Sequence, residues 1–218
     1  MAPTGVPDDD ALPLVVVYAD ESCLGNGRAG ANPGGAAGLI EYRAPGSAAL
    51  VRRDYWISEP ATTNNRMALR SAIEAFRALG AKGRRLRVLF RSDSRYIVSG
   101  MSEWVHGWMA RGWRRKGGAI ENLDLWREAA EVVRPHLTQW LWVPGHAGHP
   151  QNEYVNWLAV RAAGEQTASG GLLPSEFDRW LAGERARGKI TAAPDPFPES
   201  GAFRPGRALP PSPAARLP

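Results

Sequence analysis

Apolar runs and alternating segments predict a sheet in the first part of the chain. Residues 12–19 form an unbroken, valine-rich apolar run, which is typical of a central strand that is buried on both faces. Two further strands are predicted at 37–43 and 50–58, and turns that contain glycine and proline precede each of them. Because the connections are short, we expect these three strands to form an antiparallel meander.

Helical periodicity begins after the meander. Thr62 or Thr63 can cap a helix that continues to about residue 79, and Gly80 or Gly83 can end it. The strand predicted next, at 86–91, follows a helix, which favours a parallel crossover. The remaining predicted elements are helices at 96–110 and 123–135, a strand at 139–143 and a helix at 152–163. The chain is therefore expected to be α/β, with a five-stranded mixed sheet in the order βββαβααβα, flanked by helices.

The two ends differ in composition from this core region. We expect residues 1–11 to be a disordered N-terminal segment, residues 12–164 to be the folded domain, and residues 165–218 to be mostly disordered. A short helix is possible at 175–181, but 192–218 is rich in proline, alanine and arginine and has little material for a core.

Charge and cysteine content narrow the functional classes. The 218 residues carry a formal net charge of +5, which favours an anionic partner but does not by itself identify nucleic acid. The single cysteine, Cys23, excludes an internal disulfide and a thiolate metal site. Because no signal peptide and no run of about 18 apolar residues is present, we expect a cytoplasmic protein without a membrane partner.

Two aspartates mark the acidic chemistry of the chain. Asp20 follows the first predicted strand and Asp93 follows the fourth, and the ends of neighbouring strands can bring such side chains together. Taken singly, each could be an ordinary turn or cap residue. Clustered carboxylates can hold the two magnesium ions that hydrolyse a phosphodiester.

The motifs around these aspartates carry a family resemblance. They are Ala19-Asp20-Glu21-Ser22-Cys23-Leu24-Gly25-Asn26, Thr62-Thr63-Asn64-Asn65-Arg66-Met67-Ala68-Leu69, Ser92-Asp93-Ser94-Arg95-Tyr96 and Trp142-Val143-Pro144-Gly145-His146-Ala147-Gly148-His149-Pro150, continuing to Asn156. In this order they resemble type 1 ribonuclease H, from about residue 14 to 164. The resemblance implies the βββαβααβα fold, cleavage of the RNA strand of RNA/DNA hybrids, and Mg²⁺ or Mn²⁺ as cofactor.

The catalytic pattern of that family is incomplete here. The resemblance assigns catalysis to Asp20, Asp93 and His146, but the family's two other carboxylate positions are Ala68 and Asn156. Asn156 still offers a neutral carbonyl oxygen, so the expected metal ligands are Asp20, Asp93 and Asn156, and metal binding should be weak. Strand alternation would turn Glu21 to the opposite face unless the chain bulges there, and Glu74 and Glu153 lie further along the chain.

The resemblance also implies a surface for nucleic acid. Short amides and a helix N-terminus suit base edges, 2′-hydroxyls and phosphates, and a basic loop rich in arginine and tryptophan suits a DNA strand. Trp104 and Trp108 could instead be core residues of one helix face. The predicted contacts are Asn26, Thr63, Asn64, Asn65, Arg66, Arg95, Trp104, Arg114, Arg115 and Lys116.

Three functions follow from these motifs. The first is a hybrid-binding ribonuclease H whose activity is weakened or lost. The second is a non-catalytic module that binds RNA/DNA hybrids or double-stranded RNA. The third, a structural or protein-interaction domain, would leave the Asn64–Asn65 pair and the basic loop without a role. We expect a monomer in each case.

Overall fold

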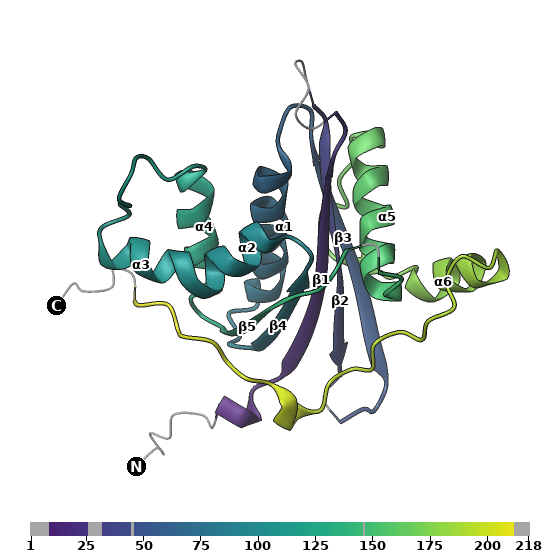
Figure 1. The fold of residues 1–218 in the computed structure, drawn as a ribbon. Helices are drawn as coiled ribbons and strands as arrows, with labels where there is room; N and C mark the ends of the chain where they lie inside the picture. The colour runs from purple at the N-terminus through teal and green to yellow at the C-terminus, as the bar shows by residue number, and fades with distance from the viewer. Residues whose placement is uncertain (1–8, 26–31, 45, 146, 212–218) are drawn as a thin grey trace, which may run out of the picture.

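The computed structural model describes residues 9–25, 32–44, 46–145 and 147–211. Its centre is one six-stranded mixed sheet in the order β5-β4-β1-β2-β3-β6 (Figure 1). The β1/β4 and β4/β5 pairs are parallel, and the other pairs are antiparallel. The strands are β1 (Leu14–Cys23), β2 (Gly34–Arg43), β3 (Leu50–Glu59), β4 (Arg87–Ser92), β5 (Leu137–Trp142) and the short β6 (Leu173–Pro174).

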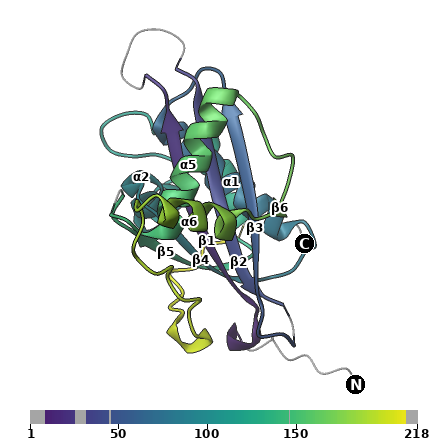
Figure 2. The same cartoon turned by 90° about the vertical axis from the view of Figure 1, so that its right-hand side faces the viewer.

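Helices cover both faces of this sheet, as Figures 1 and 2 show from two sides. The α1 helix packs on one face together with α4, and α5 packs on the other face against β1, β2 and β3. The helices are α1 (Asn64–Gly80), α2 (Arg95–Ser99), α3 (Val105–Ala110), α4 (Leu123–Val133), α5 (Pro150–Glu165) and α6 (Phe177–Ala186), with single turns η1 (Asp9–Ala11) and η3 (Ser200–Ala202). The predicted α/β fold and its element order are confirmed, with β6 and α6 added after them.

The alternation of β1 explains its central place. Val15, Val17 and Ala19 enter the core below α1 and α4, whereas Leu14, Val16 and Tyr18 enter the core below α5. Burying both faces of one strand removes a large apolar area from water. The unbroken apolar run is therefore what places β1 between two helical layers.

The predicted helix at 96–110 is interrupted. A π-helical turn, η2 (Gly100–Trp104), separates α2 from α3. A Cβ atom added to Gly100 would lie 1.9 Å from the Trp126 ring, so α4 packs directly on the backbone at this turn. The wide turn keeps the helical direction while the tryptophan of α4 occupies this space.

The C-terminal segment differs from the expected disorder. From 165 to 211 it packs on the domain, and Phe177, Leu181, Ile190 and Phe203 are buried. A few apolar residues suffice because they join a core that already exists instead of forming a new one. Residues 212–218 lie outside the described part of the chain, as do 1–8. None of the described helices is both long and apolar enough to cross a membrane.

Candidate active site

The end of the β1/β4 pairing creates an open flank on β1. The parallel pairing stops at Ala19 and Ser92, while β1 continues to Cys23 beside β2 alone. Asp93 directly follows the last paired residue of β4. The sequence predicted that Asp20 would lie at the end of its strand. Instead, β1 continues past Asp20, which is the first residue of β1 that no longer pairs with β4.

Three carboxylates meet at this flank. Asp20, Glu21 and Asp93 each place an oxygen within 4.8 Å of the others. Asp20 is buried, and its Oδ1 accepts a hydrogen bond from the Glu21 backbone N–H at 2.6 Å. The structure thus brings Asp20 and Asp93 together, as their strands predicted, and adds Glu21.

No bulge is needed to bring Glu21 into the cluster. The register of β1 with β2 runs without a break, with Asp20 opposite Ala37 and Glu21 opposite Ala36. Strand alternation does separate the two side chains at the backbone. Because β4 no longer flanks the strand here, the longer Glu21 side chain can reach Asp93 around the open edge.

The electrostatics of the cluster oppose ionisation. Burial, then the nearby Asp93 and Glu21 carboxylates, raise the pKa of Asp20 to about 9. Burial and Asp93 raise the pKa of Glu21 to about 8, against a hydrogen bond from Ser94. Among the described residues, no arginine or lysine forms an ion pair with Asp20 or Glu21.

The loop before α5 closes over the cluster. A Cβ atom added to Gly145 would lie 2.3 Å from Asp93 Oδ2, so this backbone rests on the carboxylate. Gly148, at φ +75°, donates its N–H to Glu153 Oε1 at 3.2 Å. Glu153 in turn contributes to the raised pKa of Asp20. The first turn of α5 therefore faces the acidic site.

The two substituted positions lie on the helices that flank the site. Ala68 is buried in the core on α1 and has no ligand atom in its side chain. Asn156 is half-buried on α5, three residues beyond Glu153. Among the described residues, the acidic cluster includes neither Glu74 nor Glu153. His146 lies outside the described residues, and so does Asn26.

The N-terminus of α1 carries several of the predicted nucleic-acid contacts. Thr63 is its cap, and the Thr63 hydroxyl accepts from the Arg66 N–H at 3.3 Å. Asn64 and Asn65 begin the helix, and Asn64 Oδ1 is buried without a hydrogen-bond partner among the described residues. Arg66 Nη1 donates to Asn122 Oδ1 at 3.3 Å, which connects this end of α1 to the start of α4.

The other predicted contacts form a second, more exposed group. The Arg95 guanidinium lies 3.8 Å from the centre of the Trp142 ring. Trp108 is buried, but Trp104 remains 38% exposed, so only Trp108 fits the core interpretation. Arg114, Arg115 and Lys116 are exposed in the loop between α3 and α4. The structure therefore does not join this loop to the acidic cluster.

Sequence reasoning missed two neighbours of the site. Asn122 adopts a left-handed conformation with φ 54°, and its side chain bridges Arg66 and Tyr96. The indole N–H of Trp142 donates to the Asp93 backbone oxygen at 2.9 Å. An asparagine directly before a helix is the signal that could have indicated the first, whereas nothing in the motifs pointed to the second.

Comparison with known proteins then decides the family. The RNase H family model matches residues 13–164. The chain belongs to the ribonuclease H family. Ribonuclease H of Edwardsiella ictaluri is 39% identical over 157 residues, which cover 72% of this chain and 94% of the relative. Ribonuclease H of Acidithiobacillus ferrooxidans is 40% identical over 169 residues, with 77% and 98% covered.

A solved ribonuclease H resembles a longer part of the chain. LC9-RNase H1, described as a type 1 RNase H with the type 2 active-site motif, is 63% identical, with a TM-score of 0.84. The match covers 91% of this chain and 94% of that one. This share exceeds the region that the family model matches, so the likeness extends into the C-terminal segment.

Proposed function

We propose that this ribonuclease H binds RNA/DNA hybrids and cleaves their RNA strand, with Asp20, Glu21 and Asp93 as its metal-binding carboxylates. The observation that carries this proposal is the convergence of the three carboxylates at one open strand flank. Glu21 supplies the third acid that Ala68 does not. The site then has three carboxylates where the type 1 pattern has four, and one of the three stands at a different position. LC9-RNase H1 is likewise described as a type 1 RNase H with the type 2 active-site motif.

The residues present fit a divalent cation of the hard type. Carboxylate oxygens are the preferred ligands of Mg²⁺ and Mn²⁺, and buried acids that repel one another gain most from a bound cation. Asn156 on α5 and a phosphate of the hybrid would add neutral and charged oxygens. When bound, such cations activate water and stabilise the leaving oxygen of a phosphodiester.

The protein's own groups orient the substrate and move protons. The N-terminus of α1, with Asn64, Asn65 and Arg66, offers amide and guanidinium donors to the backbone and minor groove of a hybrid. Asn64 Oδ1, buried without a described partner, is an acceptor suited to a 2′-hydroxyl or a base amine. His146, which has Gly145 and Gly148 close to it in the sequence, is our candidate for proton transfer.

A second group of donors fits the DNA strand. Arg114, Arg115 and Lys116 lie on the exposed loop after α3, and Trp104 offers a partly exposed ring in a cavity that Arg115 also lines. Phosphates attract such a loop without reading sequence. Arg95, fixed on the Trp142 ring, can contact a phosphate between this loop and the acidic site.

Cleavage of a labelled RNA/DNA hybrid, in Mg²⁺ and then in Mn²⁺, tests the proposal. Asp20→Asn and Glu21→Gln should each lower the rate by about a hundredfold or more, because even outer groups of metal sites contribute about ten- to a hundredfold. Glu103→Gln, which changes an exposed acid on η2, is the matched control and should cut at the native rate. All variants should still shift the hybrid in a gel.

Two results would contradict the proposal. If Glu21→Gln cuts as fast as the native protein, Glu21 is not a ligand, and the site depends on Asp20 and Asp93. If the native protein shifts the hybrid but cuts it in neither metal, the chain is a binding module. Ala68→Glu with Asn156→Asp would then show whether restored carboxylates recover cleavage.

A further inference from the structure

The segment after α6 forms a strap across the domain, and its contacts reach the loop of the active site. We define residues 189–211 as the C-terminal strap; Figure 1 shows it running from α6 to α3. Ile190 and Phe203 are buried, and further along Gly206 donates its N–H to the Thr138 oxygen of β5 at 2.8 Å. The strap lies beyond the region that the family model matches.

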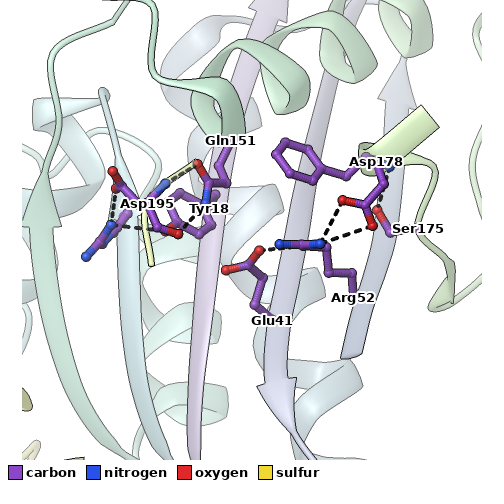
Figure 3. A network of polar contacts seen from close by, with 9 residues as sticks. Tyr18, Glu41, Arg52, Gln151, Ser175, Asp178 and Asp195 are labelled. Carbon is purple, nitrogen blue, oxygen red and sulfur yellow. Dashed lines mark hydrogen bonds and ion pairs between the residues drawn. The ribbon is translucent and has the colours of Figure 1, made fainter. Parts of the chain in front are cut away.

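The strap is fixed to the first turn of α5 through the backbone N–H and C=O of residue 195. Gln151 Nε2 donates to the Asp195 backbone oxygen at 2.9 Å, and the Asp195 N–H donates to Gln151 Oε1 at 3.0 Å (Figure 3). Gln151 is fully buried, so these paired bonds are shielded from water. They use only the backbone of residue 195 and do not depend on its side chain.

The Asp195 carboxylate makes a different connection. It forms an ion pair with Arg91 of β4, and Arg91 also donates to the Tyr18 hydroxyl of β1 at 3.0 Å. The other oxygen of the Asp195 carboxylate lies 3.9 Å from Nδ1 of His149, the residue that directly precedes α5. One side chain thus joins the end of β4 to the start of α5.

These two elements bracket the loop that touches the metal site. Val143 lies beside β4, where its N–H donates to the Ser92 oxygen at 3.0 Å, and His149 directly precedes α5. Between these points the Gly145 backbone rests on Asp93 Oδ2. A shift of α5 away from β4 would therefore move the backbone that confines the Asp93 carboxylate.

We propose that Asp195 is a positioning residue for Asp93. By joining Arg91 to the start of α5, it sets the separation of β4 and α5 and holds the Gly145 backbone against the Asp93 carboxylate. This inference rests on the proposed function, in which Asp93 is a metal ligand. Under this inference, the C-terminal strap, which lies outside residues 13–164, contributes to the geometry of the site.

Asp195→Ala separates this role from general stability. The variant keeps the backbone pairing with Gln151, so we expect it to fold. The control is Ser200→Ala, which removes the strap hydroxyl that Arg87 contacts near the opposite end of β4. Asp195→Asn keeps a hydrogen-bond acceptor for Arg91 and serves as the conservative variant.

Binding of Mn²⁺ to the full chain without nucleic acid, measured by calorimetry, is the first readout. Asp195→Ala should weaken it about tenfold, as loss of an outer orienting group does, while Ser200→Ala binds as the native protein does. The second readout is hybrid cleavage in Mg²⁺. There Asp195→Ala should lower kcat by about tenfold and change KM less than about twofold, and Asp195→Asn should recover most of the loss.

The outcomes distinguish this inference from the function on which it rests. If Asp195→Ala binds Mn²⁺ and cuts normally while Asp20→Asn does neither, Asp195 has no positioning role and the proposed function stands. If Asp195→Ala and Ser200→Ala lose activity equally and in proportion to their melting temperatures, the strap only stabilises the fold. If Asp20→Asn binds Mn²⁺ and cuts like the native protein, both proposals fail.

Discussion

Two groups of buried and half-buried acids in this protein differ in the charged groups that face them. At the open flank of β1, Asp20 and Glu21 face Asp93, and burial and like charge raise the pKa of both. On the same face of the sheet, but further along on β2, Glu41 faces an arginine, since Arg52 Nε lies 2.7 Å from Glu41 Oε1. Arg52 also forms an ion pair with Asp178, as Figure 3 shows.

The difference separates a site from a structural contact. A buried acid that is paired within the chain contributes to the fold, whereas a cluster left uncompensated stores repulsion that a bound cation can relieve. An uncompensated cluster of acids persists only because the surrounding sheet holds its side chains in place. Two kinds of substitution test this distinction: one removes the partner of a paired acid, and the other removes an acid from the uncompensated cluster.

The largest effect is expected from breaking the structural pair. Arg52→Met leaves Glu41, which is fully buried, without its cation. We expect the free energy of unfolding to fall by about 3 kcal/mol, because an unpaired buried charge is strongly unfavourable. Urea denaturation at pH 7 measures this, and kcat on the hybrid should not change.

The double variant Arg52→Met with Glu41→Gln controls for lost packing. It should recover most of the stability, since replacing both partners removes the unpaired charge. A loss in Arg52→Met no larger than about 1 kcal/mol, the value of a surface pair, would show that Glu41 and Arg52 do not behave as a buried pair.

The opposite response is expected from the acidic cluster. Glu21→Gln should raise the free energy of unfolding of the metal-free protein at pH 8 by about 1–2 kcal/mol, as substitutions that relax functional sites do. Because the folded pKa of Glu21 is raised to about 8, its cost to the fold grows as the pH rises towards that value. Thermal melts in EDTA, with Glu103→Gln as control, measure the gain. A destabilised Glu21→Gln would mean that the carboxylate is structural.

The affinity of the acidic cluster for a metal ion should depend on pH, and this dependence further tests the difference between the two groups of acids. Bound cations require ionised ligands, but the pKa of Asp20 is raised to about 9 and that of Glu21 to about 8. Mn²⁺ affinity should therefore increase between pH 6.5 and 9, by up to about tenfold per pH unit for each proton released. Calorimetry in two buffers of different ionisation enthalpy counts these protons. An affinity that is constant over this range would exclude these two groups as titrating ligands.

Much of this arrangement could be predicted from the sequence. The features that could not be predicted have identifiable physical causes. The valine-rich run placed β1 centrally, and the positions of Asp20 and Asp93 after paired strands predicted their convergence. Glu21 was assigned to the opposite face because alternation describes a strand with neighbours on both sides, and that condition ends at Ala19. Pairing between strands distant in sequence, which sets this end point, is not encoded in the local pattern.

The C-terminal strap was missed for another reason. Its composition, rich in proline and alanine, cannot form a core of its own, and this indicated disorder. The structure shows that Phe203 and Ile190 need only occupy places on an existing sheet. Partners such as Gln151, whose buried amide pairs with the backbone N–H and C=O of Asp195, become recognisable only once the two segments lie side by side. The π-helical turn at Gly100 likewise depends on Trp126 of a later helix.

A third kind of buried acid gives the smallest and most selective test. Asp54 is 2% exposed, and its Oδ2 accepts hydrogen bonds from the Tyr154 hydroxyl and the Glu176 N–H, but among the described residues no arginine or lysine pairs with it. Burial raises the pKa of Asp54 to about 6, although hydrogen bonds from the Ser175 and Tyr154 side chains and the charge of Arg161 oppose the shift. Asp54 therefore resembles the acidic cluster in that burial opposes its ionisation, but it is not part of the group of acids that could hold a metal ion in the described part of the chain.

The sign of its pH dependence follows from that shift. The unfolded Asp54 carboxyl ionises near its ordinary value of 3.8 and the folded one at about 6, so the folded state holds the proton more tightly. Its contribution to stability is complete below pH 4 and is lost as the pH rises through 6. Asp54→Asn should therefore be more stable than the native protein at pH 8 by about 1 kcal/mol relative to their difference at about pH 5.5. Paired urea titrations at the two pH values cancel the contributions of Asp20 and Glu21, and a difference that does not vary with pH would place Asp54 with the compensated acids.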